Sequence, residues 1–336
     1  MDVFALRQRL IDDYAAYIRS FILIRDRRID AKVDQDIKAG LLWPDPLLQL
    51  NPAFEPGPTV GQLVDAGILH PLCKQIFAIK EPGKADKPLR LHRHQADAVQ
   101  AAASGDNYVL TTGTGSGKSL AYIVPIVDHA LRCRAARAPA GIKAIVVYPM
   151  NALANSQLGE LEKFLETCFP EGKPPVTFRR YTGQEDEARR QEIILNPPDI
   201  LLTNYVMLEL LLTRPHEKQI INAARGLRFL VLDELHTYRG RQGADVAMLV
   251  RRVRETCESP HMQCVGTSAT LATGGTLAQQ QAAIAQVAGR LFGAPVKPER
   301  VITERLRRVT GEHPADDPTF TAALKARVAD PAWRPP

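Results

Sequence analysis

Cysteine is scarce in this chain, and the cysteines that occur follow no pairing pattern. The 336 residues include five cysteines, an odd number, and no two of them form a Cys-x-x-Cys pair. A disulfide framework or a zinc ribbon is therefore disfavoured. His70 with Cys73, or His92 with His94, could be imagined as metal ligands, but no second pair has the spacing of a zinc site, so scattered side chains are the preferred interpretation. A reducing cytoplasm is the expected setting.

Long apolar runs are also missing. Near the amino terminus, charged side chains precede the longest apolar run, residues 21–24, which is too short for a secretion signal or a membrane span. We therefore expect no membrane partner. The composition, 45% apolar and 24% charged, is that of a folded globular protein, which disfavours wholesale disorder, a collagen-like repeat and a membrane bundle.

The charge balance is mildly basic. Lys and Arg number 43 against 37 Asp and Glu, which gives a formal net charge of +6. This excess suits a nucleic-acid partner without establishing one, because many basic proteins bind no polyanion.

Composition shifts along the chain predict three parts. Residues 1–25 place apolar side chains three or four apart, which predicts an amphipathic helix. A Pro-rich connector is expected over 43–58, and a polar stretch with Pro and Gly over 81–88 indicates a domain boundary. The predicted parts are an accessory segment over 1–88, a main domain over 89–292 and a closing segment over 293–336.

In the main domain, apolar runs typical of strands alternate with helical stretches. This alternation predicts an α/β fold in which a parallel sheet is covered by helices on both faces. The expected strands are residues 108–111, 144–148, 176–180, 200–203, 229–232 and 264–267, and the expected helices are residues 119–132, 152–168, 186–195, 206–212 and 244–256.

A Gly-rich loop stands directly between the first of these strands and a helix. Its residues are Thr112, Gly113, Thr114, Gly115, Ser116, Gly117, Lys118 and Ser119. Closely spaced glycines let backbone N–H groups wrap a polyphosphate, and the helix N-terminus adds its dipole. Lys118 can then reach the β- and γ-phosphates, and the Ser119 hydroxyl can bind Mg²⁺. Thr112 stands where the general phosphate-loop pattern has its first glycine, and a Gly-rich turn without a ligand is the bland alternative.

Two further polar clusters follow later strands. Asp233 and Glu234 come directly after residues 229–232, at the strand end where a doubly wound sheet binds ligands. Asp233 is expected to hold Mg²⁺ through water, and Glu234 to orient and deprotonate an attacking water. Alone, such an acidic pair is usually a helix cap. The third cluster, Thr-Ser-Ala-Thr over 267–270, is by itself ordinary turn chemistry.

The order of these three clusters resembles motifs I, II and III in the first motor domain of superfamily 2 helicases. The resemblance covers roughly residues 89–275 and implies a RecA-like fold that binds and hydrolyses ATP with Mg²⁺. It implies catalytic roles for Lys118, Asp233 and Glu234.

Weaker stretches match the same family in the right order. Residues 91–95 resemble the Q motif, in which Gln95 reads the adenine edge and His92 or Arg93 could stack on the base. Three later elements resemble those that line the family's nucleic-acid track, where hydroxyls and helix N-termini contact phosphates. Their expected contact residues are Pro149 and Asn151 in motif Ia, Thr182 and Gly183 in a Thr-Gly element, and Thr203 and Asn204 in motif Ib. For each, a capped helix start is an alternative that is compatible with the role.

The acidic box favours one branch of the superfamily. It ends in His236, where DEAD-box RNA helicases carry Asp, and the motif Ia stretch also differs from theirs. Residues 236–243 resemble the loop after motif II in large bacterial DEAH-type DNA helicases related to the YprA and RecQ-like groups. Some of these belong to phage-defence systems such as Druantia.

Coupling between nucleic-acid contact and hydrolysis is expected at this loop. In RecQ-like enzymes an aromatic-rich loop serves this purpose, so the resemblance makes Tyr238 and Arg239 the candidates here. His236 is expected to bond the hydroxyl of Ser268 or Thr270. The alternative is a plain helix start with an exposed arginine.

The resemblance implies the ATP-binding half of a DNA helicase or translocase that moves 3′ to 5′ on single-stranded DNA. No Gln-x-x-Gly-Arg-x-x-Arg segment follows residue 270. The second RecA-like domain is therefore expected in a continuation of the chain or in another polypeptide, and this chain alone is expected to be a weak ATPase. Residues 301–304 resemble the crossing into that domain. An RNA helicase, a translocase that separates no strands and a non-catalytic scaffold for defence proteins are the alternatives.

Overall fold

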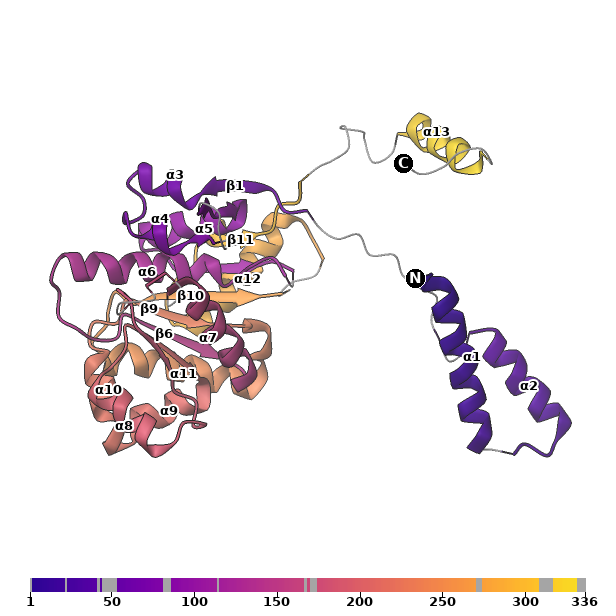
Figure 1. Cartoon of the computed structure of the whole chain (residues 1–336), viewed down its shortest axis with the longest axis horizontal. Coiled ribbons are helices and arrows are strands. Elements are labelled where there is room, and N and C mark those ends of the chain that lie inside the picture. The colour runs from indigo at the N-terminus through magenta and orange to yellow at the C-terminus, as the bar shows by residue number, and fades with distance from the viewer. Residues whose placement is uncertain are drawn as a thin grey trace. The chain divides into compact units, whose positions relative to one another are not determined.

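A computed structural model describes residues 2–21, 23–40, 43, 53–80, 86–113, 115–165, 168–169, 174–269, 274–307 and 317–330. Contacts divide the chain into two units, Met1–Pro52 and Ala53–Pro336. The first unit holds α1 (Val3–Phe21), which confirms the predicted amino-terminal helix, and α2 (Arg27–Lys38) (Figure 1). Arg19 of α1 pairs with Asp30 and Asp34 of α2 at 3.2 and 2.6 Å, which ties the two helices together.

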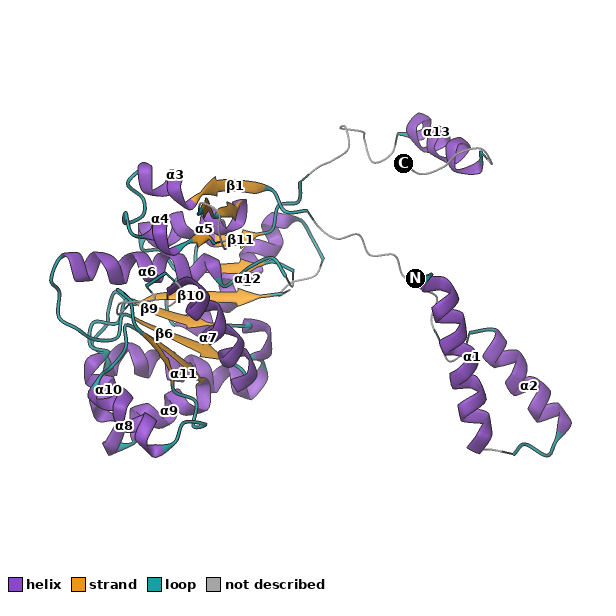
Figure 2. Cartoon of the chain, viewed as in Figure 1, coloured by secondary structure: helices purple, strands orange, loops and turns teal. Residues whose placement is uncertain are grey.

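A seven-stranded sheet forms the centre of the second unit (Figure 2). Its order is β11-β5-β10-β9-β6-β8-β7, and every neighbouring pair is parallel. This confirms the predicted α/β class and the RecA-like architecture. The strands are β5 (Tyr108–Thr111), β6 (Ala144–Tyr148), β7 (Phe178–Arg180), β8 (Ile200–Asn204), β9 (Phe229–Leu232), β10 (Gln263–Ser268) and β11 (Val301–Thr303).

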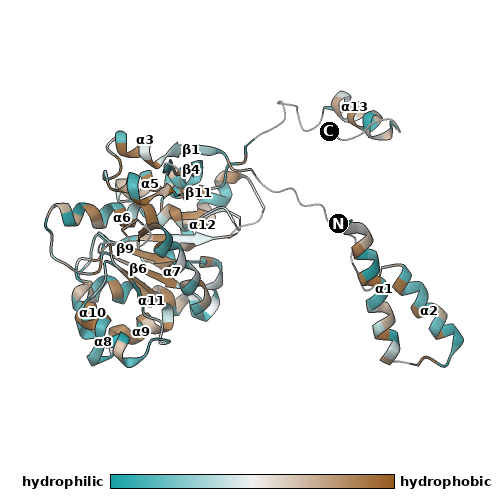
Figure 3. Cartoon of the chain, in the orientation of Figure 1, coloured by the Kyte–Doolittle hydropathy of each residue, from teal (hydrophilic) through white to brown (hydrophobic). Residues whose placement is uncertain are grey.

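Helices cover both faces of this sheet. Side chains alternate along each strand, so Ala144, Val146 and Tyr148 of β6 join one hydrophobic cluster while Ile145 and Val147 join the other. The first cluster includes α5 (Arg93–Ser104), α6 (Leu120–Ala135) and α7 (Asn151–Leu165). The second includes α8 (Glu187–Leu195), α9 (Tyr205–Thr213), α10 (Lys218–Ala223), α11 (Gly240–Thr256) and α12 (Leu277–Phe292). Figure 3 shows the central strands as mostly hydrophobic, as expected for strands buried on both faces.

The second unit begins upstream of the boundary predicted at residue 88. Val60 and Leu63 of α3 (Val60–Asp65), and Ile76 of α4 (Cys73–Ile76), are buried in the same cluster as α5 and α6. Two short antiparallel pairs lie in this region: β1 (Pro56–Thr59) with β4 (Arg90–His92), and β2 (Ala78–Ile79) with β3 (Lys87–Pro88). The contacts therefore place residues 53–80 with the main domain, because their apolar side chains complete its core.

Several other elements differ from the sequence expectation. The end of the connector predicted over 43–58 lies in strand β1 (Pro56–Thr59). The strand expected over 176–180 is shorter, because the Thr177 N–H and hydroxyl both bond the Asp199 side chain, at 2.8 and 2.9 Å. Residues 301–303 form β11 of the main sheet, so the crossing expected at 301–304 begins inside the domain's own core. Helix α13 (Pro318–Ala329) was not foreseen. Among the described residues no helix is long and apolar enough to cross a membrane.

Candidate functional site

The predicted nucleotide residues meet at the carboxyl ends of β5, β10 and β9. β10 lies between the other two strands, so it separates the phosphate loop from the acidic box by one strand. Thr112 donates its N–H to the Ser268 carbonyl at 3.2 Å, which joins the loop to β10. Of the predicted residues, Thr114 and Thr270 lie outside the described part of the chain.

The phosphate loop has the backbone that its glycines allow. Gly115 and Gly117 have φ values of +83° and +71°, which favour glycine. The Lys118 ammonium lies against the loop's own carbonyls, donating to Thr112 at 3.1 Å and to Gly113 at 3.4 Å. Ser119 follows, one residue before α6 begins. The loop therefore has the backbone and the cation that a polyphosphate site needs.

Gln95 and His94, both in α5, contact backbone carbonyls of this loop. Gln95 accepts from the His92 N–H at 2.7 Å and donates to the Gly117 carbonyl at 2.8 Å. A Cβ at Gly117 would lie 2.6 Å from the Gln95 amide nitrogen, so a side chain at this position would displace the Gln95 amide. The His94 ring, fully buried, has Nε2 3.0 Å from the Ser116 carbonyl. The sequence did not predict this contact of His94, because a histidine inside a helix carries no signal of its partner.

Arg93, predicted beside the adenine, points to another partner. Its guanidinium forms an ion pair with Asp97 one turn along α5, at 3.2 Å. His92 instead stacks on His94, with ring centroids 5.5 Å apart, and contacts Phe54 at 5.1 Å. An aromatic cluster therefore stands at the start of α5.

The acidic box is held by Thr267, the first residue of the predicted third cluster, for which the sequence predicted no separate role. The Thr267 hydroxyl donates to the Asp233 carboxylate and accepts from the Glu234 N–H at 3.1 Å. Burial raises the pKa of Asp233 above its ordinary value, although the Thr267 hydrogen bond and the Lys118 charge oppose this shift. Thr267 is fully buried, so its hydroxyl fixes both carboxylate residues to β10.

The backbone at Glu234 is strained. Its φ of +53° lies in the left-handed region, which is unusual for a residue other than glycine. The next residue, Leu235, packs closely against Gly266 of β10. A Cβ at Gly266 would lie 2.3 Å from the Leu235 side chain, so only glycine lets Leu235 bury there. The packing of Leu235 therefore helps to hold the box in its unusual turn.

His236 contacts both the acidic box and Ser268. Its Nδ1 lies 3.3 Å from the Ser268 hydroxyl, as predicted, and 3.2 Å from Glu234 Oε2. That carboxylate oxygen is buried and has no hydrogen-bond partner among the described residues. The box thus offers acidic oxygens, and with the Ser119 hydroxyl it forms the all-oxygen donor set that Mg²⁺ prefers. The residues present fit this ion.

The two predicted coupling residues differ in exposure. Tyr238 is only 4% exposed, and its hydroxyl has no partner among the described residues. Its ring therefore belongs to the core, near Tyr205, rather than to a surface that touches nucleic acid. Arg239 is exposed at the start of α11.

The predicted nucleic-acid residues gather at the same edge of the sheet, after β6, β7 and β8. Asn204 caps α9 by accepting from the Met207 N–H at 2.7 Å, and its amide nitrogen donates to Asn151 at 2.7 Å and to the Thr182 carbonyl at 3.4 Å. Asn151 starts α7 directly after Pro149 and Met150. Motif Ia, the Thr-Gly element and motif Ib are therefore joined by hydrogen bonds.

Three residues of this set, Thr203, Thr182 and Gly183, are already engaged by other groups of the protein. Thr203 is fully buried and donates its hydroxyl to the Tyr181 carbonyl at 2.6 Å. The N–H groups of Thr182 and Gly183 both donate to Glu185 Oε2, at 2.8 and 3.0 Å. Burial opposes ionisation of this carboxyl, yet these bonds and the Arg180 ion pair at 2.6 Å lower the pKa of Glu185. An acidic side chain thus occupies the amides that a phosphate could have used.

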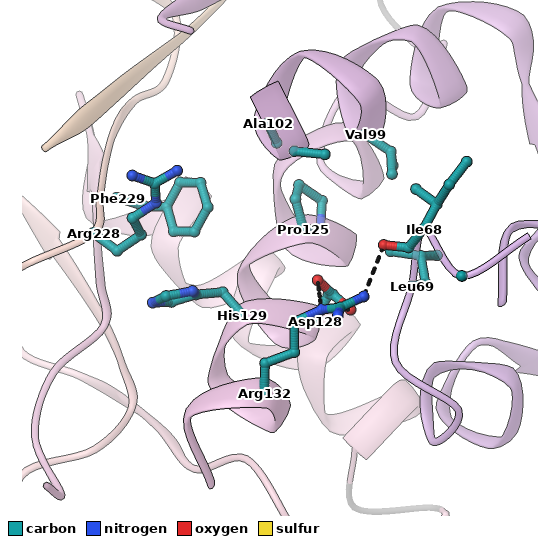
Figure 4. A pocket seen from close by; sticks show the side chains of 12 residues that line it. Ile68, Leu69, Val99, Ala102, Pro125, Asp128, His129, Arg132, Arg228 and Phe229 are labelled. Carbon is teal, nitrogen blue, oxygen red and sulfur yellow. Dashed lines mark hydrogen bonds and ion pairs between the residues drawn. The ribbon is translucent and has the colours of Figure 1, made fainter. Parts of the chain in front are cut away.

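A cavity of about 410 Å³ lies away from all these motifs (Figure 4). It is lined from α5 and α6, with Arg228 and Phe229 at the amino-terminal end of β9. His129, at its wall, has its pKa lowered to about 4 by burial and by the nearby Arg228 and Lys143 charges. Because the predicted chemistry lies at the opposite edge of the sheet, this cavity is not the candidate site.

The fold and the order of the motifs along one sheet edge define a RecA-like helicase domain. Comparison with known families agrees: residues 92–277 match the DEAD/DEAH box helicase family, and the chain belongs to it.

Individual relatives extend this likeness. The chain is 25% identical to the Druantia protein DruE of Escherichia coli (strain UMEA 4076-1), over 82% of this chain and 21% of DruE. It is 32% identical to the uncharacterized ATP-dependent helicase YprA of Bacillus subtilis, over 56% of this chain and 24% of YprA. The DUF1998 helicase MrfA, in a crystal structure with DNA and AMPPNP, superposes with a TM-score of 0.57 at 24% identity, over 78% of this chain and 33% of MrfA. The chain spans under a quarter of the length of these two curated relatives.

Proposed function

We propose that this chain is the ATP-binding and ATP-hydrolysing half of a DNA helicase or translocase. The observation that supports this most is the hydrogen-bonded path from Thr112 through Ser268 and Thr267 to the acidic box. Fixed backbone N–H groups, a lysine and two carboxylates meet where an open α/β sheet binds ligands. Membership of the DEAD/DEAH box helicase family supports ATP as the nucleotide.

Each group has a distinct part in the proposed reaction. The loop N–H groups and Lys118 would neutralise the polyphosphate. Gln95, which the resemblance assigns to the adenine edge, would support the loop through its bond to the Gly117 carbonyl. Ser119 and Asp233 would hold Mg²⁺, which when bound neutralises phosphate charge. Glu234 would orient and deprotonate the attacking water, and its buried oxygen Oε2, which contacts His236 Nδ1 at 3.2 Å, would accept that proton. His236 would link this base to Ser268.

We propose that DNA binds at the part of the sheet edge that follows β6, β7 and β8. The N-termini of α7 and α9 face the same edge as Asn151 and Asn204, and helix N-termini attract phosphates. The formal charge of +6 agrees with a polyanionic partner. Arg239 is the proposed coupling contact. We favour DNA over RNA because His236 and the motif Ia stretch depart from the RNA-helicase pattern, and because MrfA was crystallised with DNA.

The remaining parts of the proposal follow from the resemblance. A second RecA-like domain, in cis or in trans, would close the ATP site, and movement would be 3′ to 5′. The likeness to DruE suggests a role in phage defence with partner proteins, and DNA repair is the second pathway considered. The cysteines are all free thiols, which suits the cytoplasm.

Glu234→Gln tests the assignment of the base. With a second motor domain supplied, the variant should bind ATP and DNA like the wild type, yet hydrolyse ATP at least about 100-fold more slowly, because glutamine keeps the shape but cannot accept the proton. Glu255→Gln, an exposed residue of α11, is the matched control. Wild-type hydrolysis by Glu234→Gln would show that another group is the base.

A further inference from the structure

Glu304 reaches the phosphate loop from the far end of the described domain. It is the first residue after β11, and β11 pairs with β5, the strand that leads into the loop. Its carboxylate oxygen Oε2 accepts from the Gly113 N–H at 2.7 Å. A Cβ at position 113 would lie 3.3 Å from the same oxygen, so the glycine also gives the carboxylate room.

The contact has the chemistry of anion binding. A carboxylate oxygen on a loop N–H makes the same kind of charge-assisted hydrogen bond as a phosphate oxygen does. The Lys118 ammonium lies on the carbonyls of Thr112 and Gly113, so a cation and an anion are both held at the first turn of the loop. A polyphosphate entering the loop brings several negative charges toward this carboxylate.

The backbone that carries Glu304 is firmly placed. Arg305 accepts from the Glu55 N–H at 2.8 Å, and the Arg307 N–H donates to Ala53 at 2.6 Å. Glu55 in turn accepts from the Arg93 N–H at 2.9 Å, at the first residue of α5. The segment after β11 is therefore bonded both to the loop and, through residues 53–55, to the helix that carries Gln95.

We propose that Glu304 is a positioning residue for the phosphate loop. With no nucleotide bound, its carboxylate holds the loop at the Gly113 N–H. When a polyphosphate binds, the carboxylate leaves this N–H. The inference rests on the proposed function. Two consequences follow from the charge. The carboxylate lowers the affinity for ATP, because like charges repel, and nucleotide binding loosens the first residue after β11.

Glu304→Gln in the 336-residue chain tests the proposal. Glutamine keeps an acceptor for the Gly113 N–H but removes the negative charge. We expect ATP to bind roughly two- to tenfold more tightly, because the repulsion between the carboxylate and the phosphates is removed. The gain should shrink as salt rises from roughly 50 to 500 mM, and it should be absent for adenosine, which carries no phosphate. Glu299→Gln, an exposed residue before β11 with the same charge change, should leave ATP affinity unchanged.

Two further variants separate the possible outcomes. Glu304→Ala removes both acceptor oxygens and should also tighten ATP binding, and thermal melting followed by circular dichroism checks that each variant folds. If Lys118→Ala weakens ATP binding while both Glu304 variants bind ATP like the wild type, the role of Glu304 is overturned and the proposed function stands. An equal change for adenosine and ATP would also overturn it, by showing a merely structural effect. If the wild-type chain binds no ATP, the proposed function itself fails.

Discussion

The carboxyl edge of the sheet carries two regions whose polar groups are paired in different ways. In the nucleotide region, after β5, β10 and β9, the acidic box is fixed to β10. A buried carboxylate oxygen of Glu234 contacts His236 Nδ1 at 3.2 Å but has no hydrogen-bond partner among the described residues. In the track region, after β6, β8 and β7, the polar groups bond one another: Asn204 with Asn151, and Glu185 with the Thr182 and Gly183 amides.

This difference indicates different ways of binding. A site with fixed but unsatisfied groups is prepared for one ligand of defined shape, and its residues are costly to change. A surface whose groups already satisfy one another contacts a partner through helix N-termini and exposed side chains, and each contact contributes little. We therefore expect single substitutions in the nucleotide region to have large effects and those in the track region to have modest ones.

Among residues that would touch no ligand, Thr267 should affect ATP hydrolysis most when it is replaced, as in Thr267→Val. Valine has the same shape but leaves the Asp233 carboxylate and the Glu234 N–H without their shared hydroxyl, at a cost of about 1–3 kcal/mol. With a second motor domain supplied, we expect kcat for ATP to fall roughly tenfold while ATP affinity changes less than about twofold. Steady-state ATPase assays check this, with Thr256→Val on the exposed side of α11 as control. An unchanged kcat would mean that β10 does not organise the box.

Asn204→Ala should give a smaller effect, and it should change the affinity for nucleic acid rather than the affinity for nucleotide. It removes the cap of α9, which costs about 1 kcal/mol of stability, and frees Asn151. We expect affinity for single-stranded DNA to fall by roughly three- to tenfold, equivalent to about 0.7–1.4 kcal/mol, with ATP affinity unchanged. Fluorescence anisotropy measures the DNA affinity, and Asn196→Ala, an exposed residue at the end of α8, is the control. Equal losses in ATP and DNA binding would break the division between the two regions.

Arg239→Ala should give the smallest effect. The side chain is exposed and is not among the residues proposed to bind the nucleotide, so ATP affinity and the basal ATPase rate should survive. The DNA-stimulated part of hydrolysis should fall by about two- to threefold, the effect of losing one exposed phosphate contact. The measurement is ATPase rate against single-stranded DNA concentration, with a second motor domain present and Arg225→Ala as control. Equal stimulation of variant and wild type would leave Arg239 as an ordinary residue at the start of a helix.

The two regions also differ in how far the sequence predicted them. The central strands and the phosphate loop were predictable, because buried runs and the spacing of Gly115, Gly117 and Lys118 are local patterns. The partners that hold the site were not. Thr267 lies 34 residues from Asp233, and Glu304 lies 191 residues from Gly113, so only the strand order brings them together.

The track region shows what motif order alone cannot predict, namely the direction of each side chain. The sequence predicted that the motif Ia, Thr-Gly and motif Ib residues belong together, and the hydrogen bonds of Asn204 join them. It did not show that Thr203 faces the core or that Glu185 occupies the Thr182 and Gly183 amides, because a motif gives residue order without the direction of a side chain. Tyr238 is the same case: its place in the loop after motif II suggested a part in coupling, and packing buries its side chain.

Binding of ATP by this chain tests the central claim most directly, because every other role depends on the phosphate loop. A fluorescent ATP analogue is titrated with Mg²⁺ into the wild type, Lys118→Ala and Lys218→Ala, the last an exposed lysine of α10. The account predicts saturable binding by the wild type and by Lys218→Ala, and at least about tenfold weaker binding by Lys118→Ala, since its ammonium no longer neutralises the phosphates. Equal binding by all three proteins, or no saturable binding by the wild type, would contradict it.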